Sequence, residues 1–109
     1  MLIAQQVATQ LIHALPGLVE QVRGKDASLG DQVRRAASSV LLNIAEGNRR
    51  GGKDRTHHFR IAAGSAAEVG AALEVAAAWG YVEEGSLGEV RALLDRQLAL
   101  LWGLTHRRD

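Results

Sequence analysis

The sequence predicts an all-α fold, an antiparallel up-down-up-down four-helix bundle formed by one domain over residues 1–109. Alanine occurs 18 times and leucine 15 times, whereas Phe, Trp and Tyr together make up only 4% of the chain. Alanine and leucine are the best helix formers, and small side chains let helices pack closely. The absence of cysteine excludes a disulfide scaffold and a zinc–thiolate site, and an apolar fraction of 47% excludes a disordered chain.

The first predicted helix carries apolar residues at helical intervals from Ile3 to Val22. Pro16 lies inside this segment, where its missing N–H and its ring disrupt helical hydrogen bonding. We therefore expect the helix to be either kinked or broken at this proline.

The second helix is predicted to open at Asp26 or Ser28 and to continue to Gly47. The connection that follows, residues 48–53, is the only one in the chain long enough to be a functional loop. Its two adjacent glycines favour flexibility.

The strongest helical periodicity lies between Asp54 and Gly80, and the glycine is expected to end this third helix. Two stripes predict packing on more than one side, either among neighbouring helices or against another subunit. The first stripe is Phe59, Ala62, Ala66, Val69, Leu73 and Ala76, and the second is Ile61, Ser65, Glu68, Ala72, Val75 and Trp79.

The last helix is predicted to begin at Ser86, because Ser86 and Glu89 have the spacing of a capping box. In such a box each side chain bonds an exposed backbone N–H of the other residue. The expected core face of this helix consists of Val90, Leu94, Gln97 or Leu98, Leu101 and Leu104.

Polar stripes on the second and third helices are predicted to face each other. In an antiparallel pair joined by residues 48–53, the numbers of facing residues sum to about 103. This register pairs Arg35 with Glu68, Ser39 with Gly64, Asn43 with Arg60, and Glu46 with His57 or Arg60. We interpret these stripes as a buried or half-buried structural network that sets the helix register. Its predicted members are Arg35, Asn43, Glu46, Ser65 and Glu68.

No combination of residues predicts catalysis, a cofactor or a metal site. His57 and His58 are adjacent, so they diverge by about 100° on a helix and cannot chelate one ion together. The sequence contains neither the Glu-x-x-His pairs of di-iron bundles nor a glycine-rich phosphate loop. We therefore expect a non-enzymatic protein without a cofactor.

The longest uncharged run, residues 1–19, contains glutamines, a threonine and a proline, and no basic residue precedes its apolar part. This composition predicts neither a membrane span nor a signal peptide. We expect a cytoplasmic location and no membrane partner.

Positive charge is concentrated in the middle of the chain, although the formal net charge is only +1. Arginine suits phosphate because its planar guanidinium makes paired hydrogen bonds. One hypothesis is therefore an oligomer that binds RNA or DNA weakly through this cluster. The other is a protein-interaction scaffold with no nucleic-acid role, in which the cluster is a solvated loop and helix start. The clustered residues are Arg49, Arg50, Lys53, Arg55 and Arg60.

Residues 31–47, DQVRRAASSVLLNIAEG, resemble the signature Q-x-R-R-A-x-x-S-x-x-x-N-I-A-E-G of a family of four-helix-bundle proteins. Asp54 with residues 59–68, FRIAAGSAAE, is similar to a second segment of that family, and residues 79–82, WGYV, to a third. The family takes its older name from proteins encoded in intervening sequences of large-subunit ribosomal RNA genes. The matched positions are Arg35, Asn43, Glu46, Gly64, Ser65 and Glu68.

The resemblance implies a bacterial up-down bundle that assembles with itself into a barrel-shaped homopentamer. Its relatives include the accessory protein of diversity-generating retroelements, a basic pentamer that binds nucleic acid and a reverse transcriptase. RNA or DNA and a reverse transcriptase are thus the partners that the resemblance implies, although most members have no assigned activity. This chain departs from the accessory proteins in having Pro16 and a near-neutral net charge.

Overall fold

The computed structural model describes residues 2–106, and the regular structure in that range is entirely helical. The all-α prediction is therefore confirmed. The helices are α1 (Ile3–Ala14), α2 (Pro16–Arg23), α3 (Ala27–Asn48), α4 (Gly52–Ala78), the short 3₁₀ helix η1 (Glu84–Leu87) and α5 (Gly88–Thr105).

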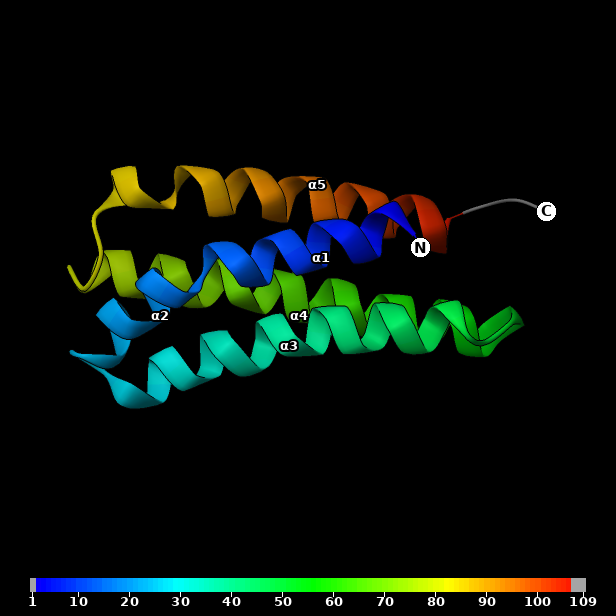
Figure 1. The fold of residues 1–109 in the computed structure, drawn as a ribbon, viewed down its shortest axis with the longest axis horizontal. Coiled ribbons are helices and arrows are strands. Elements are labelled where there is room, and N and C mark those ends of the chain that lie inside the picture. Colours follow the sequence, from blue (N-terminus) through cyan, green and yellow to red (C-terminus); the bar gives the residue numbers. More distant parts are fainter. Residues whose placement is uncertain (1, 107–109) are drawn as a thin grey trace.

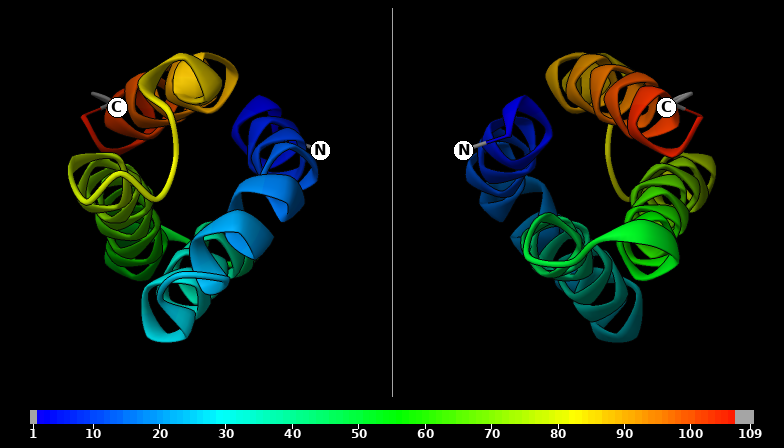
Figure 2. Two further views of the ribbon diagram at one scale, coloured as in Figure 1. Left: turned by 90° about the vertical axis from the view of Figure 1, so that its left-hand side faces the viewer. Right: turned by 90° about the vertical axis from the view of Figure 1, so that its right-hand side faces the viewer.

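The helices form a four-column bundle in which α1 and α2 together make the first column (Figure 1). Successive columns run in opposite directions along the long axis of the molecule, which measures 46 × 22 × 20 Å. Viewed end-on, the columns surround a common core (Figure 2). Contacts of α1 with both α3 and α5 close the ring.

Pro16 breaks the first column rather than kinking it. Helix α1 ends at Ala14, and α2 begins with Pro16 at a first-turn position, where the missing N–H costs no helical hydrogen bond. Leu15, between the two helices, remains buried. The column therefore changes direction without exposing its core face.

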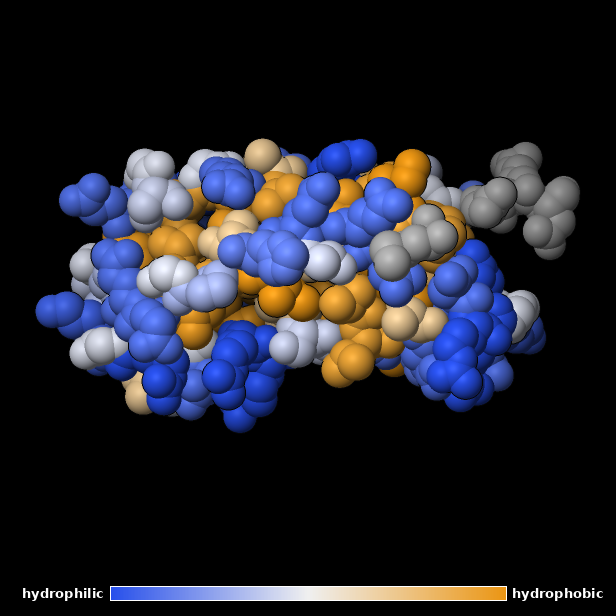
Figure 3. All heavy atoms as spheres, viewed as in Figure 1, coloured by the Kyte–Doolittle hydropathy of each residue, from blue (hydrophilic) through white to orange (hydrophobic). Residues whose placement is uncertain are grey.

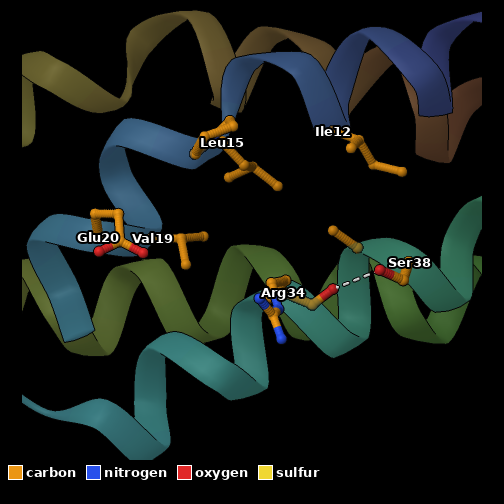
Figure 4. Close-up of a pocket in the computed structure, with 8 residues that line it drawn as sticks. Ile12, Leu15, Val19, Glu20, Arg34 and Ser38 are labelled. Atoms are coloured by element: carbon orange, nitrogen blue, oxygen red, sulfur yellow. Dashed lines mark hydrogen bonds between the residues drawn. The ribbon is translucent and has the colours of Figure 1, made fainter.

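A hollow of about 230 Å³ lies between this break and α3. Figure 4 shows Ile12, Leu15 and Val19 on one side and Arg34 and Ser38 on the other. The Ser38 hydroxyl donates to the Arg34 carbonyl within α3, at 2.9 Å. The hollow is smaller than the roughly 300–1,000 Å³ of ordinary ligand pockets, and we assign it no ligand.

Two of the predicted helix ends are confirmed. Asp26 caps α3 by accepting a hydrogen bond from the backbone N–H of Leu29, at 3.0 Å, so the helix opens at the first of the two candidate residues. Gly80 ends α4 with φ at +79°, and the N–H of Tyr81 bonds the Ala76 carbonyl at 2.8 Å. This pairing is the Schellman arrangement that favours glycine.

The predicted capping box of the last helix is wrong. The Ser86 hydroxyl donates instead to the carbonyl of Glu83, at 2.7 Å. This bond belongs to the 3₁₀ turn of η1, and α5 begins only at Gly88, without a side-chain cap. The local Ser–Glu spacing is therefore overridden by burial of Leu87, which anchors η1 in the core.

The two stripes of α4 have different environments. All six residues of the first stripe are buried in the core. In the second stripe Ala72 is buried, whereas Ile61, Val75 and Trp79 are 38%, 43% and 71% exposed. By length and composition α4 is the one described helix apolar enough to cross a membrane, a property that core helices of bundles share. Helix α4 thus carries large apolar side chains that lie outside the core of the single chain.

The ends of α3 and α4 approach closely at Gly47. A Cβ atom at this position would lie 2.7 Å from Cε1 of the buried Phe59 ring and 3.2 Å from the Arg55 carbonyl oxygen. Both neighbours are held in the packed interface, so neither can move aside freely. Only glycine permits this distance between the two backbones.

We predict that Gly47→Ala lowers the free energy of unfolding by about 1–3 kcal/mol, the usual cost of overpacking. The measurement is urea denaturation followed by circular dichroism. Gly103→Ala is the matched control, since nothing lies within 4 Å of the added methyl group on α5. That control is expected to raise stability by up to about 1 kcal/mol, and equal effects of the two substitutions would contradict the prediction.

Candidate nucleic-acid interface

The basic cluster lies at the end of the bundle where α3 turns into α4 (Figure 1). Figure 3 shows strongly hydrophilic side chains gathered at this end. The predicted connection over residues 48–53 is shorter than expected, because α3 continues to Asn48 and α4 already begins at Gly52. Gly52 makes the tight turn possible with φ at +59°. The cations therefore project from a compact helical turn.

Two of the five cations are partly neutralised by a carboxylate. Arg50 donates to Glu46 at 3.1 Å, and Arg49 lies 3.6 Å from the same carboxylate. Arg50 also approaches Asp54 at 3.9 Å. The hydrogen bond and charge of Arg50, with the charge of Arg49, hold the pKa of Glu46 below its ordinary value. Exposed pairs of this kind are weak, so both arginines remain available to a phosphate.

Arg55 has a structural position. It is half-buried, and its guanidinium lies over the Phe59 ring at 4.8 Å from the centroid. One of its nitrogens donates to the Gly47 carbonyl at 3.4 Å. Arg55 thus connects the start of α4 to the end of α3. We therefore no longer expect it to contact a ligand directly.

Lys53 and Arg60 are the most available cations of the cluster. Both are exposed, and neither forms an ion pair with any residue from 2 to 106. Together with Arg49 and Arg50 they give this end of the bundle a surplus of positive charge over the carboxylates of Glu46 and Asp54. Such a surface favours a polyanion.

A hydrogen-bonded network joins α3 and α4 farther along the two helices from the turn that carries this cluster. The hydroxyls of Ser39 and Ser65 lie 2.8 Å apart, and the Asn43 amide donates to Ser39 at 3.1 Å. The Asn43 carbonyl oxygen is 3.1 Å from Nδ1 of His58. The structure therefore brings together two of the five residues of the predicted network, while Ser39 bonds Ser65 rather than facing Gly64. His58 was not predicted to join this network, and it lies one position away from His57, which was expected to face α3.

The other three residues of the predicted network do not join it. Glu46 pairs with the arginines of its own helix end, as described above. Arg35 and Glu68 are exposed and enter no ion pair among the described residues. The expected Arg35–Glu68 pair is therefore wrong within one chain, because both positions turn outward from the α3–α4 interface.

The chemistry of this region is that of charge recognition. Among residues 2–106 no group of three or more His, Cys, Asp or Glu side chains is placed to hold a metal ion. The groups that converge at the turn are guanidinium, ammonium and imidazole groups together with the carboxylates of Glu46 and Asp54.

The sequence matches the family model of the 23S rRNA-intervening sequence protein over residues 1–103. The chain belongs to this family. The match confirms the resemblance drawn from residues 31–47 and 54–68.

A solved structure of the same family has the same fold. It is described as a protein of unknown function from the S23 ribosomal protein family of Bacteroides thetaiotaomicron. The two chains are 17% identical with a TM-score of 0.88, and the alignment covers 96% of this chain and all of the other. At this identity the likeness shows the fold alone. No curated protein matches the sequence.

We predict that Arg50→Ala raises the pKa of Glu46 toward its ordinary value near 4.5, because it removes the hydrogen bond that favours the carboxylate. In the unsubstituted protein the pair persists above pH 4.5 and is lost as the pH falls through the lowered pKa. The measurement is an NMR titration of the Glu46 carboxyl carbon. Arg91→Ala is the control, since Arg91 lowers the pKa of Glu84 instead. A Glu46 pKa that responds equally to both substitutions would contradict this assignment.

Proposed function

We propose that this protein is a non-enzymatic homopentamer, located in the bacterial cytoplasm, that binds RNA or DNA through its basic α3–α4 turns. The observation that carries the proposal is the exposure of Arg49, Arg50, Lys53 and Arg60 at one end of the bundle. Arginine and lysine neutralise phosphates and release counterions from nucleic acid, which supplies sequence-independent affinity.

The outer face of α3 and α4 supports self-association. Leu42 on α3 is 68% exposed, and the second stripe of α4 adds Ile61, Val75 and Trp79. Large apolar side chains gathered on one face are typical of protein interfaces. We define the α3–α4 face by these four residues together with the exposed Arg35, Gly64 and Glu68.

The charges of the α3–α4 face are suited to a second copy of the same chain. Arg35 and Glu68 have opposite charges and no partner among the described residues of their own chain. A ring is closed by heterologous contacts, in which one patch of a subunit meets a different patch of the next, so Arg35 of one copy can meet Glu68 of its neighbour. Gly64 is exposed with nothing within 4 Å, which leaves room for another helix to approach.

Assembly would strengthen weak binding. A single turn offers about four available cations, and non-specific affinity of so few contacts is low at physiological salt. Five turns on one particle would raise the local concentration of binding sites along a single strand. The two parts of the proposal therefore support each other.

An interaction scaffold without a nucleic-acid role is the alternative, and the exposed apolar α3–α4 face favours it. In that case another protein, such as the reverse transcriptase implied by the family resemblance, would cover the face in place of a second copy. A monomeric chain with no salt-dependent affinity for RNA or DNA would favour this alternative.

The nucleic-acid prediction is tested by combining Arg49→Ala, Lys53→Ala and Arg60→Ala. The triple variant is expected to lose most of the affinity for RNA or DNA, and the slope of log affinity against log salt should fall by about 0.7–0.9 per lost phosphate contact. Fluorescence anisotropy between about 50 and 200 mM salt measures both quantities.

Two controls accompany this experiment. Arg96→Ala removes an exposed cation of α5 outside the cluster and should leave the affinity unchanged. Glu46→Gln removes the carboxylate that holds Arg49 and Arg50 and should raise the affinity. A slope near zero for the unsubstituted protein would exclude the nucleic-acid role.

The assembly prediction is tested with Val75→Asp. The new carboxylate would be buried unpaired between subunits, which is strongly destabilising, whereas the position is exposed in a single chain. We expect the mass measured by light scattering on a sizing column to fall from that of a pentamer to that of one chain, with unchanged circular dichroism. Ala99→Asp, on the exposed face of α5, is the matched control. A monomeric unsubstituted protein at micromolar concentration would refute the assembly.

A further inference from the structure

The last turn of α5 carries a flat aromatic pair that the proposed function does not use. The indole of Trp102 and the imidazole of His106 are stacked, with centroids 4.2 Å apart and planes inclined by 12°. Trp102 is nevertheless 64% exposed. The pair therefore presents a large aromatic surface to solvent at the end of the helix.

Backbone carbonyls hold this pair in place. Nδ1 of His106 lies 2.8 Å from the Trp102 carbonyl oxygen, and since a carbonyl only accepts, Nδ1 is the donor. The Thr105 hydroxyl donates to the Leu101 carbonyl at 3.0 Å. The imidazole is thus oriented parallel to the indole before any ligand arrives, which lowers the entropic cost of binding.

The end of α5, whose last turn carries the stack, lies at the same end of the bundle as the α3–α4 turn (Figures 1 and 2). Helices α4 and α5 are antiparallel, and Gly70 faces Leu94, since a Cβ atom on Gly70 would lie 3.7 Å from Cδ1 of Leu94. Arg60 precedes Gly70 by ten residues, and Leu104 follows Leu94 by ten. Arg60 is therefore level with the turn of α5 that holds Trp102 and His106.

Arg60 of α4 and Trp102 of α5 also lie on the sides of their helices that border a common groove. The α4–α5 groove has a volume of about 440 Å³, and Ala67 and Gly70 of α4 and Asp95 and Leu98 of α5 are among its lining residues. Trp102 follows Leu98 by four residues and Arg60 precedes Ala67 by seven, so each continues its stripe toward the basic end. An exposed cation and an exposed aromatic surface thus border the same end of the groove.

We propose that the Trp102–His106 stack is a base-stacking subsite for single-stranded nucleic acid, with Arg60 and Lys53 positioned for the adjoining phosphates. This inference rests on the proposed function and adds its substrate class. The groove itself carries Glu74 and Asp95 as well as Arg91, so the surplus of positive charge lies only at its end, at Lys53 and Arg60. Aromatic side chains beside exposed cations bind unpaired bases regardless of sequence, because every base has a π-face. In a duplex those faces are covered by neighbouring base pairs, so the stack would discriminate against double strands.

The test uses the tryptophan fluorescence of the full chain. The sequence has two tryptophans, so Trp79→Phe leaves Trp102 as the only indole, and light scattering checks that assembly is retained. The probes are an oligothymidine of about twenty nucleotides, longer than one site of about 4–16, and a blunt DNA duplex of equal length. We expect the oligothymidine to quench Trp102 and the duplex to leave it unchanged.

Substitutions in this background separate stacking from charge, and the fluorescence anisotropy of dye-labelled probes measures their affinities because Trp102→Ala and Trp102→Phe remove the last indole. Trp102→Ala should weaken oligothymidine binding about tenfold and leave duplex affinity and the salt slope unchanged. Trp102→Phe is the matched control and should retain most of the affinity, while His106→Ala should weaken single-strand binding alone.

The possible failures are distinguishable. If the unsubstituted protein binds neither probe in a salt-dependent manner, the proposed function itself fails. If it binds both probes and Trp102→Ala weakens both equally or neither, the stacking inference fails while the proposed function stands. A change of oligomeric mass in Trp102→Ala would also overturn the inference, because the indole would then belong to a contact between copies.

Discussion

The close approach of α3 and α4 is the constraint on which the rest of the structure depends. Gly47 allows the two backbones to come together against the Phe59 ring, and Gly52 begins α4 after a connection of only three residues. The Ser39–Ser65 and Asn43–His58 bonds then set the register higher along the same pair. A bulkier residue at Gly47 would separate the helices and disturb both the network and the position of the basic turn.

This packing also decides which residues remain outside. Once the first stripe of α4 fills the core, its second stripe turns outward beside α3, and Ile61, Val75 and Trp79 are left exposed. Arg35 and Glu68 belong to the same outer surface. The proposed assembly accounts for these exposed residues as contacts between chains.

Periodicity and local rules predicted most of the fold. The core stripe of α4, the interruption at Pro16 and the Gly80 terminus all depend on residues close in the sequence, and these predictions are confirmed. The structure chose a break over a kink at Pro16, and Asp26 over Ser28 as the helix cap. The Ser86 capping box was wrong because a tertiary contact, burial of Leu87, selected a 3₁₀ turn. The Trp102–His106 stack was missed, although its spacing of four residues was a visible signal.

The sequence by itself determined the fold class, the helices and the concentration of cations near the α3–α4 turn, because these follow from composition and from spacing along the chain. Only the tertiary structure decided which polar side chains meet. A shift of one residue between helices rotates a side chain by about 100°, so Ser39 reached Ser65, and Arg35 and Glu68 turned outward. The tertiary structure also places the end of α5 at the same end of the bundle as the basic turn, because antiparallel packing brings together segments that lie far apart in the sequence.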